Sequence, residues 1–315
     1  MPTMTQAQLT AWGSPDSFTF AQVDIPEALS GRLVIKNLAA GLNPVDWKTR
    51  AGAGIAGMIS LDKPAVLGWD LAGEVVATGP ETTGFEVGDL VFGMPAFPDL
   101  GSCYAEYVQV KVTDVIHAPT GVDIQTLGAV PLASLTAYQG LFDVGELQSG
   151  QKVLVQGGTG GVGHLAVQLA HAAGAQVWAT ASTRNQEFLA HLGATPIDYT
   201  TTDLSEYAGQ FDIILDTVGG EVFTKSLPLL TTNGRIVTCP DPSQIAAARQ
   251  AGHDAHWVFV HPNATELGKI AQALASKTLN VHIEKVFPFT QLSEAHRLGE
   301  TGHVRGKLVI NFDQN

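Results

Sequence analysis

The sequence is poor in positive charge and in cysteine. Its 315 residues include 17 Lys and Arg against 30 Asp and Glu, a formal net charge of -13, and only two cysteines. Nucleic acids and anionic membranes attract basic surfaces, so this balance argues against both as partners. Cys103 and Cys239 lie too far apart in the sequence to form a clip or a metal motif. This cysteine usage suits a reducing compartment, and we expect a cytoplasmic protein.

Targeting and membrane-spanning segments are not indicated either. No basic region followed by an apolar core precedes Arg32, so the sequence predicts no signal peptide. The uncharged run at residues 153–178 has the length of a membrane span, but glycines and two histidines interrupt it. With 45% hydrophobic residues the chain can bury a large core instead, and its length predicts two domains.

Inside this uncharged run, a strand, a glycine-rich turn and a helix are predicted in succession. Val153–Gln156 is apolar like a buried parallel strand, and Val162–Ala173 has helical apolar spacing. The turn between them fits G-x-G-x-x-G at Gly158, Gly160 and Gly163. Such a turn brings backbone N–H groups and a helix N-terminus close to a pyrophosphate. Glycine-rich turns also occur for structural reasons alone, so the flanking elements decide between the two interpretations.

The residues after this turn continue the alternation of strands and helices. An apolar strand at Gln176–Thr180 follows at the distance that a βαβ unit requires. A helix reaching Leu192, a short strand near Ile197, the run "FDIILDTVGG", a helix through Leu230 and the strand "GRIVT" come next. This order predicts a doubly wound parallel sheet and favours the pyrophosphate site.

The two ends of the chain read differently from the middle. Residues 1–121 hold short alternating runs separated by Gly, Pro and Asp turns, which predicts a mostly β domain. "NATELGKIAQALA" predicts a helix in which Asn263 is the N-cap and Glu266 completes a capping pair. A strand, a helix and the last strand "GKLVI" follow and should return to the first domain. We therefore expect one domain at 1–121 and 266–315 and a second at 122–265.

Seven segments carry a resemblance to a known family. The chain resembles the zinc-independent branch of the medium-chain dehydrogenase/reductase superfamily, in particular its NADPH:quinone oxidoreductases and enone reductases. The resemblance implies a GroES-like, mostly β catalytic domain, a Rossmann domain that binds NADP(H), and a homodimer. It also implies that Thr136 lies near the nicotinamide and that Gly160–Val162 lies at the pyrophosphate. The segments are "GLNPVDWKTRAG", "PAVLGWDLAGEVVATG", "GFEVGDLVFG", "AVPLASLTAYQGL", "VLVQGGTGGVG", "FDIILDTVGG" and "VFPFTQLSEAHRLGETGHVRGKLVI".

Residue chemistry argues against a metal. A catalytic zinc needs three Cys, His or acidic ligands, and zinc-containing relatives place a cysteine and a His-Glu pair where this chain has Asn43, Trp69 and Asp70. We therefore predict no metal site. Without a Lewis acid, alcohol oxidation is disfavoured. The remaining chemistry is hydride transfer from NADPH to a quinone or an activated α,β-unsaturated carbonyl.

Four residues near the start of the chain are candidates for the acceptor site. Asn43 and Lys48 could stabilise the developing oxyanion as hydrogen-bond donors. The alternatives are a turn-forming role for Asn43, which precedes Pro44, and a solvated surface position for Lys48. Trp47 and Trp69 could form an apolar wall for a flat acceptor, or could belong to the core.

The residues after the second strand of the βαβ unit predict the choice of cofactor. In "ATASTRNQE" no acid precedes Glu187, whereas Ser182 offers a hydroxyl and Arg184 a cation for a 2′-phosphate. The alternative is that Arg184 opens the next helix and faces solvent. The position of Tyr199 in the resemblance places it at the adenosine. The predicted NADPH-binding residues are Thr136, Gly158, Gly160, Gly161, Val162, Gly163, Ser182, Arg184 and Tyr199.

Two other functions remain open on the sequence. An enoyl-thioester reductase would share this resemblance, but it would need a surface or pocket for a carrier-bound thioester. A non-catalytic protein of the same fold could bind NADPH without turning it over. The physiological acceptor is not specified by the sequence in any of these cases.

Overall fold

Two main sheets lie in two separate units of the computed structural model, which describes residues 2–312. The chain crosses from unit 1 to unit 2 after Leu132 and returns after Val260, and Thr278–Asn280 also belongs to unit 2. The first boundary therefore comes later than the expected residue 121. The reason is that α2 (Ile124–Ala129) packs against strands of unit 1. Among the described residues, no helix has both the length and the apolar character that a bilayer span requires.

Unit 2 is built on a six-stranded parallel sheet in the order β10-β9-β8-β11-β12-β13. This is the predicted doubly wound sheet, in which chain order reverses beside the first strand. The sheet has one more strand than the sequence indicated, because β13 extends it at one edge. The strands are β8 (Lys152–Gln156), β9 (Gln176–Ala181), β10 (Thr195–Asp198), β11 (Phe211–Asp216), β12 (Leu230–Thr238) and β13 (Asp254–Trp257).

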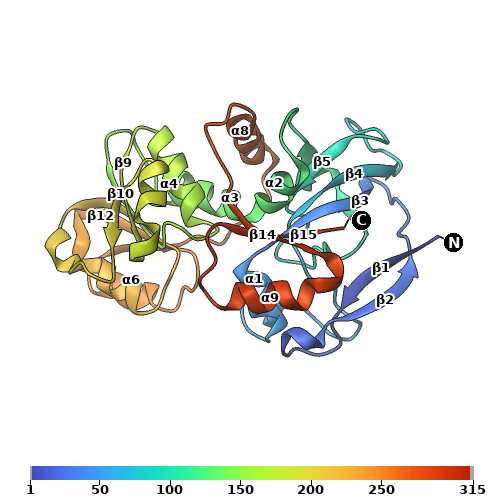
Figure 1. Cartoon of the computed structure of the whole chain (residues 1–315), viewed down its shortest axis with the longest axis horizontal. Coiled ribbons are helices and arrows are strands. Elements are labelled where there is room, and N and C mark those ends of the chain that lie inside the picture. The colour runs from blue at the N-terminus through green and yellow to red at the C-terminus, as the bar shows by residue number, and fades with distance from the viewer. Residues whose placement is uncertain (1, 313–315) are drawn as a thin grey trace. The chain divides into compact units, whose positions relative to one another are not determined.

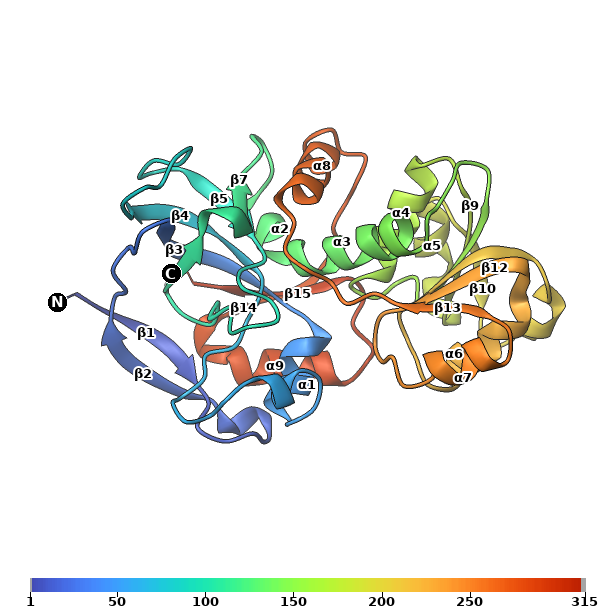
Figure 2. The same ribbon diagram turned by 180° about the vertical axis from the view of Figure 1, so that it is seen from behind.

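The helices of unit 2 cover both faces of its sheet. Figure 2 shows α4 on one side of the strands and α6 and α7 on the other. The helices are α4 (Gly163–Ala172), α5 (Gln186–His191), α6 (Glu221–Ser226) and α7 (Ile245–Gln250). Helix α4 ends where predicted, because Gly174 adopts a φ of 82°. Covered on both faces, the central strands β8 and β11 are almost entirely buried.

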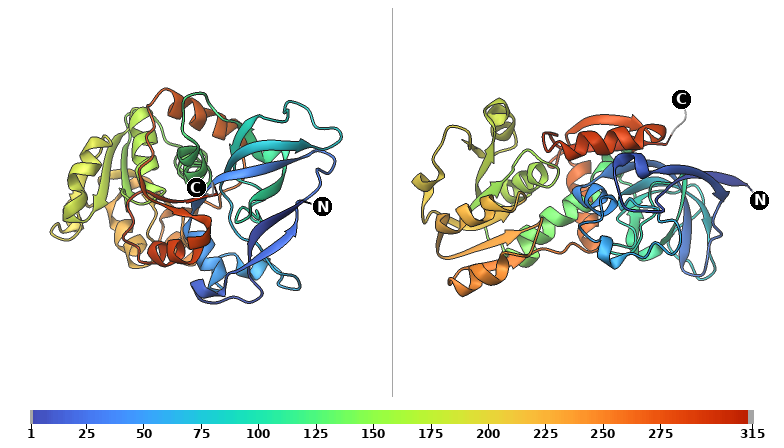
Figure 3. Two further views of the ribbon diagram at one scale, coloured as in Figure 1. Left: turned by 45° about the vertical axis from the view of Figure 1, so that its right-hand side comes forward. Right: turned by 90° about the horizontal axis from the view of Figure 1, so that it is seen from below.

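Unit 1 contains a mostly antiparallel seven-stranded sheet and a separate hairpin of β1 and β2. The order is β14-β15-β3-β4-β5-β7, and β6 pairs with β3. The C-terminal strand β15 pairs with β3, so the predicted return of the last strand to the first domain is confirmed, as Figure 3 shows in red and blue. The strands are β1 (Thr3–Gln8), β2 (Thr19–Asp24), β3 (Arg32–Leu42), β4 (Leu71–Thr78), β5 (Leu90–Gly93), β6 (Tyr107–Lys111), β7 (Val115–His117), β14 (Ile283–Pro288) and β15 (Lys307–Asn311).

The remaining helices of the chain include α8, whose N-cap was predicted from the sequence. Its N-cap Asn263 accepts hydrogen bonds from the backbone N–H groups of Thr265 (3.0 Å) and Glu266 (3.2 Å), which confirms the predicted N-cap. Helix α1 lies beside α9 in unit 1 (Figure 1). These helices are α1 (Pro44–Arg50), α3 (Pro131–Tyr138), the π-helix η4 (Gln139–Val144), α8 (Ala264–Ala275) and α9 (Leu292–Glu300). The 3₁₀ turns are η1 (Pro15–Ser17), η2 (Ala56–Met58), η3 (Val112–Asp114), η5 (Thr183–Asn185), η6 (Leu204–Tyr207), η7 (Leu227–Leu229) and η8 (Phe289–Gln291).

Candidate functional site

The glycine-rich turn of unit 2 joins β8 to α4 at the carboxyl edge of the sheet. A Cβ on Gly163 would lie 2.2 Å from the Gly157 carbonyl oxygen, and one on Gly158 would lie 2.6 Å from Ala179 Cβ. A Cβ on Gly160 would meet only the Gly157 oxygen, at 3.5 Å. Two of the three fingerprint glycines are therefore required by close packing, whereas a methyl group at Gly160 would make only an ordinary van der Waals contact.

Backbone donors at the start of α4 are left without protein partners. Among residues 2–312, no hydrogen bond engages the backbone N–H of Gly161, Val162 or Gly163. The turn itself is fixed, because Gly160 N–H donates to Gly157 O (3.1 Å) and Gly157 N–H donates to the Thr180 hydroxyl (3.0 Å). Three adjacent free donors at a helix N-terminus are the arrangement that suits an anion such as a pyrophosphate.

The end of β9 lies beside this turn, because β9 pairs in parallel with β8. Ser182 directly follows β9, and the exposed Arg184 lies in the next turn. Tyr199 follows the neighbouring strand β10, is 59% exposed, and donates its backbone N–H to Ala181 O (3.3 Å). Three predicted cofactor residues thus cluster at adjacent strand ends, next to the predicted pyrophosphate turn.

A carboxylate that sequence reasoning missed lies at the same edge. Asp198 accepts hydrogen bonds from the Thr200 hydroxyl (2.6 Å) and the Thr200 backbone N–H (2.9 Å). Hydrogen bonds from the Thr183 and Thr200 hydroxyls lower the Asp198 pKa, so the group is ionised at neutral pH. The only signal in the sequence was its position at the end of a strand predicted to neighbour β9.

Unit 1 contains a buried cluster of ionisable and amide side chains around Lys307 on β15. The Lys307 ammonium donates to the Leu42 carbonyl (2.9 Å) and to Asn43 Oδ1, and it lies 3.5 Å from Asp70 Oδ2. Asn43 Nδ2 donates to the same Asp70 oxygen at 2.8 Å, and Leu132 N–H donates to Asp70 Oδ1 at 2.7 Å. Four segments distant in the sequence therefore meet at one buried cation.

Asp46 forms the second acidic part of this cluster. Its Oδ2 accepts the Asn43 backbone N–H at 2.6 Å within the capping box of α1, whereas its buried Oδ1 has no hydrogen-bond partner within residues 2–312. Burial raises the Asp46 pKa to about 8. Burial also raises the Asp70 pKa, but the Lys307 charge and the donors on both Asp70 oxygens oppose that shift. We therefore assign the extra proton of the cluster to Asp46 and the carboxylate to Asp70.

The other predicted residues of the acceptor site differ in exposure. Trp69 is fully buried, donates its indole N–H to Asp99 O (2.7 Å) and meets Phe97 edge to face, which favours its core role. Trp47 is half-buried and packs on α9, since a Cβ on Gly299 would lie 2.7 Å from its ring. The half-buried Lys48 side chain forms no ion pair or hydrogen bond within residues 2–312.

The described residues do not fit a zinc ion. Among residues 2–312, no three His, Cys, Asp or Glu side chains gather in a group that could hold a metal. Trp69 contributes no ligand atom, and Asp70 is already paired with the Lys307 ammonium.

Lys307 was not among the residues selected from the sequence. Its only signal there was its position, a lysine inside an apolar terminal strand.

Comparisons with known proteins agree with this fold. The family model described as "Alcohol dehydrogenase GroES-like domain" matches residues 30–120, and the model described as "Zinc-binding dehydrogenase" matches residues 192–310. These ranges fall largely on the β-rich unit and on the second half of the parallel sheet with the C-terminal strands. The second description includes zinc, whereas the residues that the structure describes contain no group of three possible zinc ligands.

Similar proteins cover nearly the whole chain. A 2-methylene-furan-3-one reductase of Solanum lycopersicum is 35% identical, over 96% of this chain and 77% of that protein. An NADPH-dependent alkenal/one oxidoreductase, chloroplastic, of Arabidopsis thaliana is 31% identical, over 92% of this chain and 74% of that protein. The structure of the quinone oxidoreductase from Coxiella burnetii matches with a TM-score of 0.95 and 36% identity, over 99% of this chain and 100% of that one. The chain therefore belongs to the medium-chain dehydrogenase/reductase superfamily, among its quinone oxidoreductases and enone reductases.

Proposed function

We propose that this protein is an oxidoreductase that transfers a hydride from NADPH to a quinone or to the β-carbon of an enone, without zinc. The observation that carries the proposal is the turn between β8 and α4, with three free backbone donors and two glycines that close packing requires. Such a turn suits the pyrophosphate of a dinucleotide. The names of the three relatives above support the class of acceptor.

The residues around the turn suit NADPH. Gly161, Val162 and Gly163 would donate to the pyrophosphate, and Ser182 and Arg184 would bind the 2′-phosphate. Tyr199 would cover the adenosine, and Thr136 would lie beside the nicotinamide. When bound, this cofactor supplies the hydride, so the protein has to orient the ring and to exclude water. The ionised Asp198 carboxylate would repel the 2′-phosphate. The preference for NADPH therefore depends on the positive charge of Arg184.

In unit 1, two residues would stabilise the oxyanion that forms on the acceptor. Lys48 has an ammonium group without a partner in the described part of the chain, and α1 holds its backbone. The Asn43 amide has its oxygen engaged by Lys307 and one N–H engaged by Asp70, which leaves its second N–H for the acceptor. Because the donor set does not fit a Lewis acid, the acceptor has to be activated by its own conjugation.

A homodimer and a reducing compartment complete the proposal. The strand β13 ends the parallel sheet, and its last residue Trp257 and the nearby Phe259 are 38% and 37% exposed. An edge strand flanked by exposed aromatic rings suits pairing with a second copy of this chain. Cys103 and Cys239 are both free thiols, as expected in a reducing compartment. The cytoplasmic location stays a prediction, since one relative is chloroplastic.

A screen of NADPH oxidation tests the function. Purified protein is assayed with quinones, short enones, alkenals and enoyl thioesters, with NADH as the comparison cofactor and with a chelator as the metal control. We expect turnover with quinones or enones, unchanged by chelation, and a kcat/KM for NADPH about 10-fold or more above that for NADH. In Arg184→Ala this preference should fall through KM for NADPH. Activity that chelation abolishes and zinc restores would contradict the metal-free mechanism, and turnover of thioesters alone would favour an enoyl reductase.

A further inference from the structure

Helix α3 and the π-helix η4 form one helical segment, residues 131–144, which contains Thr136. The segment begins in unit 1 and continues in unit 2, because the boundary between the units falls after Leu132. Thr136 lies near its middle and is only 6% exposed. π-Helices are rare and occur frequently at functional sites. The position of Thr136 therefore depends on what holds the two ends of this segment.

A carboxylate holds the N-terminal end. Asp70 Oδ1 accepts the backbone N–H of Leu132 at 2.7 Å, in the first turn of the segment, where N–H groups lack helical partners. Asp70 is fully buried, and Lys307 and Asn43 fix its other oxygen. A negative group at this end also interacts favourably with the helix dipole. Asp70 thus links the segment to the buried cluster of unit 1.

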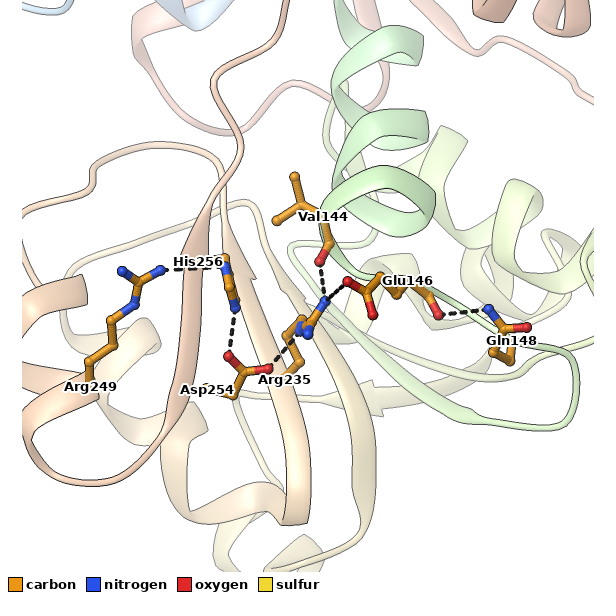
Figure 4. Close-up of polar contacts among 7 residues, drawn as sticks. All are labelled: Val144, Glu146, Gln148, Arg235, Arg249, Asp254 and His256. Atoms are coloured by element: carbon orange, nitrogen blue, oxygen red, sulfur yellow. Dashed lines mark hydrogen bonds and ion pairs between the residues drawn. The ribbon is translucent and has the colours of Figure 1, made fainter.

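A guanidinium holds the C-terminal end. Arg235 on β12 donates from Nη1 to the carbonyl of Val144, the last residue of η4, at 2.7 Å (Figure 4). The same Nη1 lies 3.0 Å from Glu146, and Nε donates to Asp254 on β13 at 2.7 Å. His256 lies 2.6 Å from the second Asp254 oxygen, so both oxygens of this carboxylate are engaged. Arg235 is therefore itself fixed in place by two strands and a loop, and its positive charge suits a helix C-terminus.

Close packing leaves this end of the segment little freedom. A Cβ on Gly140 would lie 2.8 Å from Leu215 Cδ1 on β11, and one on Gly145 would lie 2.5 Å from the Leu141 carbonyl. The segment therefore touches the central strand that follows β8 in the sheet order. This packing holds the last turn of η4 only on the side that faces β11. Loss of the Arg235 contact would therefore leave the carbonyl end of η4 free to move.

We propose that Asp70 and Arg235 are positioning residues that hold the two ends of segment 131–144 and thereby fix Thr136 against the nicotinamide. The inference rests on the proposed NADPH site. Each acts through a backbone group of the segment, Leu132 N–H at one end and Val144 C=O at the other. Because misplacement of reacting groups by about 1 Å can cost on the order of 100-fold in rate, small movements of this segment should appear in kcat.

The test compares whole NADPH with a fragment that lacks the nicotinamide, adenosine 2′,5′-bisphosphate. Arg235→Gln should lower kcat by about 10-fold or more and weaken NADPH binding several-fold, because Thr136 moves. The same variant should bind the fragment as wild type does, since the fragment uses the ends of β9 and β10. Arg235→Lys should be intermediate, because an ammonium keeps the charge but cannot reach Val144 and Asp254 together. Asp70→Asn is the corresponding change at the other end.

The matched control is Lys225→Gln, which removes an exposed cation from the same unit, and it should change neither ligand's affinity. An Arg235→Gln protein with wild-type kcat and wild-type NADPH affinity would overturn the proposal. An equal loss of affinity for NADPH and for the fragment would also overturn it, because it would indicate that unit 2 as a whole has loosened. If Arg235→Gln does not fold, the same measurements are made on Arg235→Lys. If the proposed function is wrong, the wild-type protein shows no turnover. The affinities for NADPH and for adenosine 2′,5′-bisphosphate would still test the inference in that case.

Discussion

The two candidate sites are built from different parts of the chain. In unit 1, four side chains from three distant segments, Asn43 and Asp46, Asp70, and Lys307, meet in a buried cluster. In unit 2, the site is mostly backbone, formed by consecutive residues between β8 and α4. The first site depends on compensation of buried charge, and the second depends on glycines that allow close approach. The two should therefore respond very differently to substitution, pH and salt.

The largest effect is expected where a buried charge loses its partner. Lys307→Met should lower the free energy of unfolding by about 3–5 kcal/mol, because Asp70 is left buried without its cation. Urea denaturation followed by tryptophan fluorescence measures this. The control Lys225→Met removes an exposed cation that lies 3.0 Å from Glu221, and should cost less than about 0.5 kcal/mol. The double variant Lys307→Met/Asp70→Asn should recover part of this loss of stability. A Lys307→Met protein as stable as wild type would indicate that Asp70 and Lys307 are uncharged in the folded protein.

A smaller loss of stability is expected in the backbone site. There, substitution of Gly163 tests close packing, and substitution of Gly160 tests binding alone. Gly163→Ala should lower the free energy of unfolding by about 1–3 kcal/mol and abolish NADPH binding, because its methyl group would overlap the Gly157 carbonyl. Gly160→Ala should leave stability unchanged, since its nearest neighbour is 3.5 Å away, and should weaken NADPH binding only by crowding the pyrophosphate. Thermal unfolding and cofactor titration measure the two properties. Equal stabilities for both variants would mean that the turn can rearrange around a methyl group.

Asp46 gives the unit 1 cluster a dependence on pH that the backbone site lacks. Its pKa in the folded protein is about 8, above the ordinary value of 3.8, so folding takes up a proton between these values. The free energy of unfolding should therefore decrease as pH rises from about 4 to about 8. Asp46→Asn mimics the protonated acid and should flatten this slope, with its advantage over wild type greatest on the alkaline side. Parallel pH profiles for the two proteins would place the proton elsewhere.

The smallest effect is expected for the exposed ion pairs of unit 2. Hydrogen bonds from Arg235 and His256 lower the Asp254 pKa overall, although partial burial opposes them. The contribution of Asp254 is therefore present above the ordinary carboxylate pKa and is lost as pH falls through its lowered value. Asp254→Asn should cost no more than about 1 kcal/mol, and high salt should reduce that difference further. A loss as large as that of Lys307→Met would remove the distinction between the two networks.

Local signals in the sequence predicted most of the parallel sheet and the backbone site. The fingerprint glycines, the two strands around α4 and the Asn263 cap each depend on residues within one turn or one βαβ unit, and all three are present. Helix α7 and strand β13 were missed because six and four residues are too short to display a period. Helix α3 and the π-helix after it were also not predicted, because their apolar residues are not confined to one helical face.

The buried cluster was only partly predictable. Asn43 was selected from the sequence as a hydrogen-bond donor, but its fixed amide orientation depends on Lys307 and Asp70. Lys307 and Asp70 are 237 positions apart, and no periodicity links residues at that separation. A lysine in the apolar run "GKLVI" contradicts the pattern of a buried strand, and such a contradiction is the signal that could have selected it. Contacts of this kind come from topology, which single-sequence patterns do not determine.

The origin of Lys307 in the last strand has a consequence for the order of folding. During synthesis, β3, β4 and the buried acids Asp46 and Asp70 emerge long before β15, while the whole parallel sheet of unit 2 lies between them in the chain. Unit 2 can therefore complete its core while unit 1 still lacks both a central strand and its buried cation. Domains fold as units when their residues are available, and contacts between distant residues form late. Strand β15 both brings the cation that pairs with Asp70 and joins β14 to β3, so cooperative stability of unit 1 should be acquired only after β15 has emerged.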